Sequence, residues 1–235
     1  MTAFNYSDGD ARCEGYAALP AGAGPFPAMV IFHNWAGQGP HDGAAADRLA
    51  TQGYAAFAAD IYGAGMRGDP MGDNMHLMGP WMADRAGLQQ RILAAVTAVA
   101  AHPAVDAGRI AVMGYCFGGL CALDAARSGD TRVRGAVSFH GSYSPPAIGP
   151  QAEIGAKVLV LHGWTDPVCP PDETVAVAHE LEAAGADWQI HAYGRTGHAF
   201  TAPGLDNRAA GMFYQPDADR RSWQALSNFL AEVLA

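Results

Sequence analysis

The sequence is organised around one stretch, Gly114-Tyr115-Cys116-Phe117-Gly118-Gly119. An apolar run over residues 110–113 precedes it and a helix-like run over residues 120–127 follows it, which predicts a strand, a tight turn and a helix. Glycines two positions before and after Cys116 leave room for the strained backbone that a residue at the tip of such a turn adopts. This is the pattern of a nucleophile elbow, with cysteine in place of the usual serine.

Cys116 has the setting that a nucleophilic thiol needs. Unpaired N–H groups and the positive dipole end at the start of the following helix favour the thiolate, which is the reactive form. The N–H of Phe117 points to where an oxyanion would form. The alternative is a buried structural cysteine, because free Cys is among the most buried residue types. The strand, turn and helix context favours the nucleophile.

Length and composition favour one α/β domain over residues 1–235, because a chain of this size can cover both faces of a full sheet. No repeat, low-complexity tract or linker interrupts it. The apolar stretches are shorter than the roughly 20 residues that span a bilayer. The first residues also lack a basic region followed by an apolar one. We therefore expect a cytoplasmic protein.

Charge and cysteine usage narrow the class of partner. The formal net charge is −9 with no basic cluster, which argues against nucleic acid and anionic membranes. The cysteines are scattered without metal-ligand spacing and fit free thiols better than a disulfide framework. They are Cys13, Cys116, Cys121 and Cys169.

Apolar runs separated by turn signals predict alternating strands and helices. The strands are expected over residues 11–19 (an edge strand), 28–32, 54–59, 110–113, 133–139, 157–161 and 188–193. The helices are expected over residues 44–52, 83–102, 120–127, 171–184 and 217–234. Residues 63–82 are expected to be irregular, and their methionines suit a lid or an adaptable pocket wall, although ordinary loop packing fits them equally. This alternation predicts a doubly wound, mostly parallel sheet with helices on both faces.

Residues 33–37 follow a strand that reads as buried on both faces. Loops at the carboxyl ends of parallel strands build the ligand crevice in such folds, so this loop is a candidate wall of the site. The backbone N–H of Trp35 would then supply a second oxyanion donor. The alternative is a plain connecting turn.

A cysteine nucleophile needs a base within hydrogen-bond reach and a third group that orients the base. Asp166 and His198 each follow a predicted strand and come after Cys116 in that order. Nucleophile, acid and histidine is the chain order of the α/β-hydrolase fold. Asp166 has a competing reading as a turn-forming residue before Pro167.

The other histidines are weaker candidates for the base. Three of them lie at a helix end, on a helix or inside a strand: His102, His179 and His191. Three more lie at strand ends and could line the pocket: His33, His140 and His162. A metal site built from them is conceivable, but no two have ligand spacing, so we expect no metal.

The elbow, the stretch His162-Gly163 with Asp166-Pro167, and Gly197-His198-Ala199-Phe200 together make the chain resemble the dienelactone hydrolase family. The resemblance extends over nearly the whole chain and includes residues 60–63 and the helix with Arg85 and Arg91. It implies an α/β-hydrolase fold and a cofactor-independent esterase that opens lactones through a thioacyl intermediate. It also implies the triad Cys116, Asp166 and His198, and the backbone N–H groups of Phe117 and Trp35 as oxyanion donors.

Two positions depart from the family's pattern. Asn34 stands where well-studied members have a glutamate that helps to generate the thiolate, and an amide cannot take a proton. Ala202 stands where an arginine would hold a substrate carboxylate. Arg67 or Arg85 could supply a replacement. Otherwise we expect neutral substrates to be preferred over carboxylated ones.

The sequence therefore predicts a hydrolase of lactones or activated carboxylic esters that acts on small molecules without a cofactor, as a monomer or homodimer. The substrate pocket is expected to include Asn34, His33, Tyr115, Tyr62, Arg85 and Phe200. The competing interpretation is a non-catalytic protein of the same fold that binds a small ligand or responds to redox change through Cys116.

Overall fold

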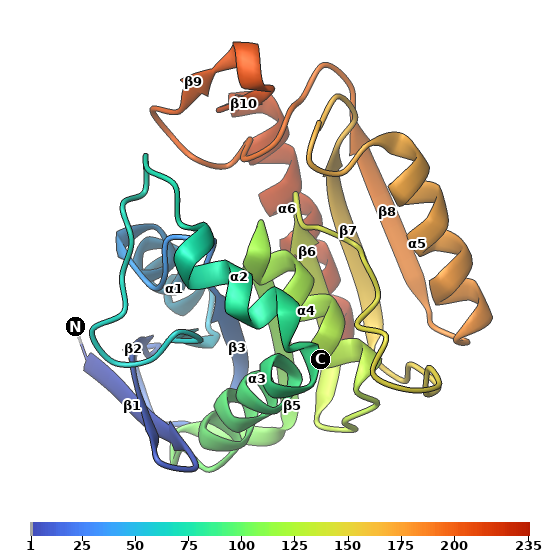
Figure 1. Cartoon of the computed structure of the whole chain (residues 1–235). Coiled ribbons are helices and arrows are strands. Elements are labelled where there is room, and N and C mark those ends of the chain that lie inside the picture. Colours follow the sequence, from blue (N-terminus) through green and yellow to red (C-terminus); the bar gives the residue numbers. More distant parts are fainter. Residues whose placement is uncertain (1) are drawn as a thin grey trace.

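A computed structural model describes residues 2–235, and its centre is one eight-stranded sheet (Figure 1). The strands along the chain are β1 (Thr2–Asp8), β2 (Ala11–Ala18), β3 (Phe26–Phe32), β4 (Ala55–Ala59), β5 (Val105–Tyr115), β6 (Val133–Phe139), β7 (Lys157–Gly163) and β8 (Trp188–Tyr193). Their spatial order is β1-β2-β4-β3-β5-β6-β7-β8. The β1–β2 and β2–β4 pairs are antiparallel, and all other neighbours in the sheet are parallel. The predicted mostly parallel, doubly wound sheet is confirmed.

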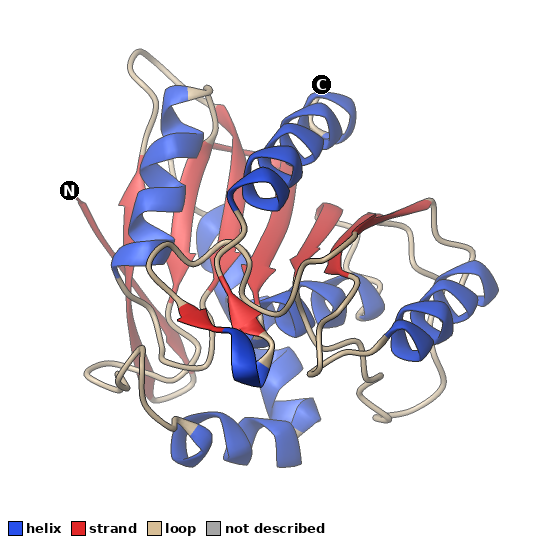
Figure 2. Ribbon diagram, turned by 90° about the horizontal axis from the view of Figure 1, so that it is seen from above, coloured by secondary structure: helices blue, strands red, loops and turns tan. Residues whose placement is uncertain are grey.

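The helices cover both faces of this sheet (Figure 2). They are α1 (Pro40–Thr51), α2 (Met75–Ala83), α3 (Arg85–Ala100), α4 (Phe117–Arg127), α5 (Pro171–Ala183) and α6 (Pro216–Val233). Helices α1 and α6 pack on one face, while α3, α4 and α5 pack on the other. Side chains of β3 alternate between the two layers, because successive residues of a strand point to opposite faces. Val30 thus belongs to the α3–α4 layer and Ile31 to the α1–α6 layer.

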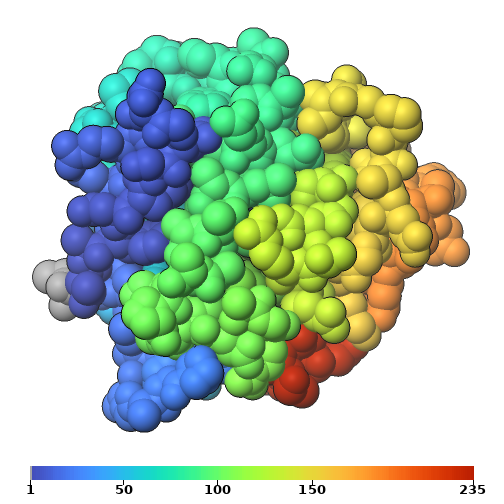
Figure 3. All heavy atoms as spheres, turned by 90° about the horizontal axis from the view of Figure 1, so that it is seen from below, coloured from blue at the N-terminus to red at the C-terminus, as the bar shows by residue number. Residues whose placement is uncertain are grey.

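The carboxyl ends of the parallel strands lie at one edge of the sheet, where the connecting loops meet. Figure 1 places a small antiparallel pair above this edge. It consists of β9 (Asp206–Asn207), the 3-10 turn η1 (Arg208–Ala210) and β10 (Met212–Phe213). The view from below in Figure 3 shows the opposite end, where the N-terminal hairpin (dark blue) lies beside the green segment around α3. Within residues 2–235, no helix is both long and apolar enough to cross a membrane.

The predicted central strands and most helices occur within a few residues of their expected bounds. One expectation about the sheet is wrong: residues 11–19 do not form its edge. An additional strand, β1, pairs outside β2 and takes the edge position. Its signal was the alternation of buried Phe4 and Tyr6 with exposed neighbours, which is short and mostly polar.

The expectation of irregular structure over residues 63–82 is wrong from Met75 onward, where α2 begins. The pair Gly79-Pro80 reads as a helix breaker, since proline removes a backbone donor and clashes with the preceding turn. The structure nevertheless contains Pro80 within the helix, and buried Leu77 packs α2 into the α3–α4 layer. Tertiary packing here outweighs local propensity.

Candidate active site

Cys116 lies at the tip of the turn between β5 and α4, as predicted from the sequence. Its backbone has φ 56° and ψ −114°, a left-handed conformation that is strained for a residue with a side chain. The flanking glycines permit this turn. A Cβ at Gly118 would collide with the carbonyl oxygen of Phe32, and one at Gly114 would collide with the backbone of Gly118. The elbow therefore packs directly against the end of β3.

Cys116 is the one partly exposed thiol of the four, and the other three are buried. Burial would raise the pKa of Cys116, but His198 and the N–H of Phe117 outweigh it, so that the pKa lies below its ordinary value of 9.0. Burial raises the pKa of Cys121, and it raises that of Cys169 to about 12. Cys116 alone thus has the environment of a reactive thiolate.

His198 and Asp166 lie beside Cys116. The Nδ1 of His198 is 2.8 Å from Oδ2 of Asp166, and both side chains are almost fully buried. Burial would lower the pKa of His198, but the Cys116 thiolate and Asp166 raise it to about 10. The raised pKa of the imidazole and the lowered pKa of the thiol both favour a thiolate–imidazolium pair.

Backbone hydrogen bonds hold the loops that carry Asp166 and His198 in place. The Oδ1 of Asp166 accepts hydrogen bonds from the N–H groups of Val168 (2.8 Å) and Cys169 (3.2 Å). The N–H of His198 donates to Gly211, and its carbonyl accepts from Phe213, next to the β9–β10 pair. Asp166 and His198 therefore keep fixed positions on separate loops.

Two backbone N–H groups are candidates to hold an oxyanion. Phe117 begins α4, and its N–H stabilises the adjacent sulfur. The N–H of Trp35 has no protein partner within residues 2–235. The Trp35 loop is ordered by its own contacts, since Oδ1 of Asn34 accepts from the N–H of Ala36 (2.8 Å) and the hydroxyl of Tyr62 donates to the carbonyl of Trp35 (3.0 Å).

Most of the residues predicted to line the pocket are buried in the packing around the site. His33 and Phe200 are fully buried, and Tyr115 and Tyr62 nearly so. Tyr62 stacks on Phe117 with ring centroids 5.7 Å apart. Asn34 is half-buried, and its side-chain oxygen accepts a hydrogen bond from the N–H of Ala36. These side chains support the loops of the site rather than forming an open surface.

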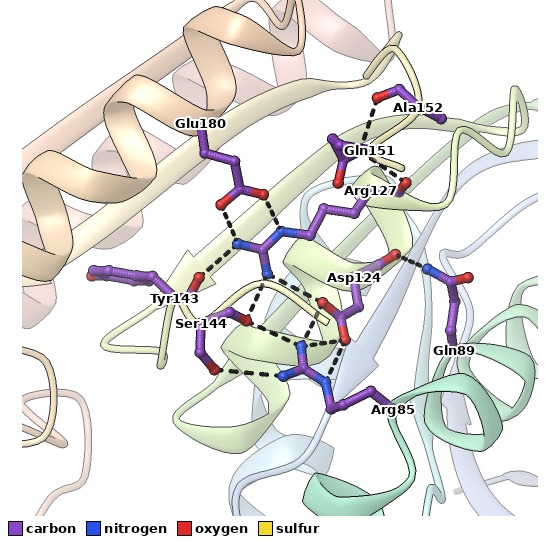
Figure 4. A network of polar contacts seen from close by, with 9 residues as sticks. All are labelled: Arg85, Gln89, Asp124, Arg127, Tyr143, Ser144, Gln151, Ala152 and Glu180. Atoms are coloured by element: carbon purple, nitrogen blue, oxygen red, sulfur yellow. Dashed lines mark hydrogen bonds and ion pairs between the residues drawn. The ribbon is translucent and has the colours of Figure 1, made fainter. Parts of the chain in front are cut away.

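Arg85 belongs to a buried network under α4 (Figure 4). Its guanidinium makes a bidentate ion pair with Asp124 and also reaches Ser144. Arg127 joins the same carboxylate and pairs with Glu180. Because these partners occupy the Arg85 donors, the structure does not place this arginine as a carboxylate ligand beside Cys116.

Arg67 is likewise engaged within the protein. Its guanidinium donates to Oδ1 of Asp60 at 3.1 Å and to three backbone carbonyls, those of Gly63, Met66 and Glu14. The two arginines considered as replacements for the missing one at Ala202 thus both have internal partners. Among the described residues, no three His, Cys, Asp or Glu side chains gather in a way that could hold a metal ion.

Two of the remaining histidines lie near the candidate triad. The ring of His140 packs edge-on against His198 with centroids 5.2 Å apart, and its Nε2 is 2.8 Å from the hydroxyl of Thr201. His162 is buried and hydrogen-bonds to the hydroxyl of Tyr143. Both histidines follow predicted strands, but neither spacing nor composition in the sequence encodes the contact between His140 and His198.

Comparison with known proteins gives a consistent result. The family model described as "Dienelactone hydrolase family" matches residues 13–234. An uncharacterised protein of Caenorhabditis elegans, K02A2.1, is 34% identical over 156 residues, which are 65% of this chain and 99% of that protein. A protein of Aquifex aeolicus, provisionally named a carboxymethylenebutenolidase, is 27% identical over 95% of this chain and 94% of its own length.

Solved structures agree with these relatives. The crystal structure of P91, a dienelactone hydrolase-like promiscuous phosphotriesterase from metagenomic libraries, superposes with a TM-score of 0.93 at 34% identity. The match covers 100% of this chain and 98% of P91. A dienelactone hydrolase-like structure from Klebsiella pneumoniae matches with a TM-score of 0.79 at 26% identity and covers 98% of both chains.

Proposed function

Because this chain belongs to the dienelactone hydrolase family, a family of α/β-hydrolase fold, we propose that it hydrolyses lactones or activated carboxylic esters through a thioacyl intermediate on Cys116. One observation carries this proposal: the imidazole of His198 lies between the carboxylate of Asp166 and the thiol of Cys116, in an environment that favours the thiolate. That arrangement supplies a nucleophile, a proton carrier and an orienting group.

In the acylation half of the proposed reaction, the Cys116 thiolate attacks the carbonyl carbon of the ester. The carbonyl oxygen becomes an oxyanion, which accepts hydrogen bonds from the N–H groups of Phe117 and Trp35. Collapse of this intermediate breaks the bond to the leaving oxygen, which takes the proton of the His198 imidazolium. The products of this half are a thioester on Cys116, a free alcohol or enol, and a neutral imidazole.

In the deacylation half, the neutral His198 removes a proton from water as the water oxygen attacks the thioester carbon. The second oxyanion occupies the same two N–H groups. Its collapse releases the carboxylic acid and restores the Cys116 thiolate beside the His198 imidazolium. Asp166 accepts the Nδ1–H of His198 throughout and keeps Nε2 directed at the sulfur.

The chemistry of the nucleophile restricts the substrates. A thiolate leaves more readily than an alkyl alkoxide, so its adduct with an ordinary alkyl ester returns to starting material. Enol lactones and aryl esters have stabilised leaving groups and are therefore the substrates we propose. P91 is named as a promiscuous phosphotriesterase, so an aryl phosphotriester is a second electrophile for the same thiolate and belongs in the substrate screen.

The test is a rapid-mixing experiment with p-nitrophenyl acetate, followed by mass spectrometry of the quenched protein. We expect a burst of p-nitrophenol equal to the concentration of sites and an acetyl group on the peptide that contains Cys116. Cys116→Ala should give neither. Acetylation elsewhere, or none at all with the intact thiol, would favour the competing proposal of a non-catalytic or redox-responsive protein.

Location and assembly complete the proposal. Free thiols at all four cysteines suit the reducing cytoplasm, where we place the protein. The residues of the proposed reaction all come from one chain, so a monomer or a homodimer is compatible with the mechanism.

A further inference from the structure

His33 is fully buried at the end of β3, and both of its ring nitrogens are occupied by backbone groups. Its Nε2 is 3.1 Å from the backbone nitrogen of Ile61, and its Nδ1 is 2.6 Å from the carbonyl oxygen of Asn34. The side chain therefore cannot contact a substrate or carry protons to one. The sequence predicted that His33 lines the substrate pocket, whereas in the structure its ring lies between the backbone groups of Asn34 and Ile61.

These two contacts fix where the proton lies on the ring. A backbone N–H can only donate, so Nε2 of His33 must accept from Ile61. A carbonyl oxygen can only accept, so Nδ1 must carry the hydrogen and donate it to Asn34. The ring is thus neutral with a defined tautomer, and burial, as the largest influence, lowers the pKa of His33 to about 4.

The carbonyl of Asn34 belongs to the same peptide group as the N–H of Trp35. That peptide is trans, because the Gly24–Pro25 bond is the one cis bond within residues 2–235, so its C=O and N–H point in opposite directions. The carbonyl oxygen accepts from His33 at 2.6 Å and from the N–H of Gly37 at 3.2 Å, and the closer donor, His33, holds the plane of the peptide so that the Trp35 N–H points away from the imidazole. His33 also polarises the group, which strengthens the N–H as a donor.

We propose that His33 is a positioning residue that orients and polarises the Trp35 N–H toward the oxyanion. The inference rests on the proposed function of Cys116 and deepens it. The backbone of Gly118, in the first turn of α4, lies directly against the carbonyls of Phe32 and His33, so the loop that His33 holds is adjacent to Cys116.

Ile61, whose N–H donates to Nε2 of His33, lies in a segment that further hydrogen bonds hold in place. The carboxylate of Asp60, just before Ile61, accepts from the N–H groups of Glu14 and Gly63 and from Arg67. The carbonyl of Ile61 accepts from Arg91. A series of hydrogen bonds therefore runs from these charged groups through Ile61 and His33 to the peptide that carries the donor.

Tyr62 joins the two halves of the proposed oxyanion hole. Its hydroxyl donates to the carbonyl of Trp35, while its ring stacks on Phe117 and packs edge-on against His33 with centroids 4.6 Å apart. The loop is thus held from both sides, by His33 at the Asn34–Trp35 peptide and by Tyr62 at the Trp35–Ala36 peptide.

Two substitutions of similar size distinguish the role of Nδ1 as a donor from the role of Nε2 as an acceptor. In His33→Asn, the amide nitrogen occupies the place of Nδ1 and can still donate to Asn34. In His33→Gln, the amide oxygen occupies the place of Nε2 and can still accept from Ile61, but the side-chain donor to Asn34 is lost and that carbonyl keeps only the N–H of Gly37 (3.2 Å). His179→Gln, at an exposed position on α5, is the control for an unrelated histidine.

Each variant is measured in three ways: steady-state hydrolysis of p-nitrophenyl acetate, inhibition by an aryl trifluoromethyl ketone, and alkylation by iodoacetamide. The ketone forms a C–S bond with the thiolate and leaves an oxyanion in the hole, whereas alkylation needs the thiolate but no oxyanion. We expect His33→Gln to lose about 10- to 100-fold in kcat with a small change in KM, since loss of a whole donor costs about 100- to 1000-fold. The inhibition constant should rise by the same factor and the alkylation rate should not change.

His33→Asn should recover most of the lost kcat. Equal losses in the two variants, or a His33→Gln enzyme with wild-type kcat and inhibition, would overturn the proposal. The nitrogen-15 NMR spectrum of the unsubstituted protein provides a second test that needs no variant to fold. A His33 ring protonated on Nε2, or one that titrates above pH 6, would also overturn it. If the wild type forms no acyl-enzyme on Cys116, the proposed function fails instead, whatever the tautomer of His33.

Discussion

The Nδ1 atom of His198 lies 2.8 Å from Oδ2 of Asp166, although the two residues follow different strands and are 32 positions apart in the sequence. The other carboxylate oxygen of Asp166 is already taken by two backbone N–H groups. These backbone hydrogen bonds fix the orientation of the Asp166 carboxylate independently of the imidazole. The carboxylate in turn favours the tautomer with the proton on Nδ1, which leaves Nε2 of His198 free to face Cys116.

Replacement of Asp166 by Asn should lower kcat/KM by about 10⁴-fold, as when the orienting carboxylate of such a triad becomes an amide. The amide would favour the wrong tautomer of His198 without emptying the site. His198→Ala should be at least as damaging, with unfolding temperatures close to wild type. His191→Ala, on β8, is the matched control. A larger loss in His162→Ala than in His198→Ala would reassign the base.

Cys116→Ala should abolish turnover of every ester that the wild type accepts. Cys13→Ala, Cys121→Ala and Cys169→Ala should each retain activity, because these thiols are buried and their pKa values are raised. Steady-state assays of the four purified variants provide the comparison. Activity in Cys116→Ala comparable to that of the wild type would refute the mechanism.

The pH dependence follows from the two shifted groups. Cys116 has a pKa below 9.0, so the thiolate takes up a proton and reactivity falls as the pH drops through that lowered value. His198 has a pKa of about 10, so the general acid is lost as the pH rises past it. Activity should be bell-shaped between these limits. The rate of alkylation by iodoacetamide should show the acid limb alone. In His198→Ala the midpoint of that limb should move to higher pH, because burial raises the pKa of Cys116 once the imidazole that lowers it is gone.

Neutral substrates should be preferred over carboxylated analogues. A paired arginine contributes on the order of tenfold to a hundredfold to binding of a carboxylate. Position 202 has alanine instead, while Arg67 and Arg85 have internal partners. We expect kcat/KM for a matched pair of esters to favour the neutral member at low and high salt, and Ala202→Arg to narrow the difference. A preference for the anion under both conditions would contradict this expectation.

The network under α4 should contribute to stability rather than to chemistry. Asp124 is 0% exposed and neutralises two buried arginines, Arg85 and Arg127. Asp124→Asn leaves those charges without their shared partner, so the free energy of unfolding should fall by about 3–5 kcal/mol. Urea denaturation measures this change. Asp206→Asn breaks an exposed ion pair with Arg208 and should change stability little.

The central strands were predictable because they are apolar on both faces, as in β3 and β6, and because turn signals bound them. The missed elements have weaker signals. Strand β1 alternates only two buried residues with polar ones, and α2 contains Gly79-Pro80, so its helical form depends on the packing of Leu77. The strands of the β9–β10 pair have two residues each, too short for any period to be visible.

The positions of the candidate triad were predictable because parallel strands end at a common edge, and residues just after those ends are brought together. The supporting residues were not. His33 read as a pocket residue because it follows β3, but its ring turns inward to backbone groups of another loop. Arg85 was expected in the pocket because the resemblance to the family implies a carboxylate-binding arginine, but its guanidinium is paired with buried Asp124, 39 positions away.

The distance along the chain between the parts of the site makes the thiol of Cys116 a reporter of folding. Asp166 and His198 follow Cys116 by 50 and 82 residues, so both reach it only after β7 and β8 have joined the sheet. Until then the thiol lacks the imidazole that ionises it. In a refolding experiment at neutral pH, fast alkylation of Cys116 should therefore begin only when β7 and β8 have joined the sheet. The time at which it begins should mark the time at which the sheet is complete.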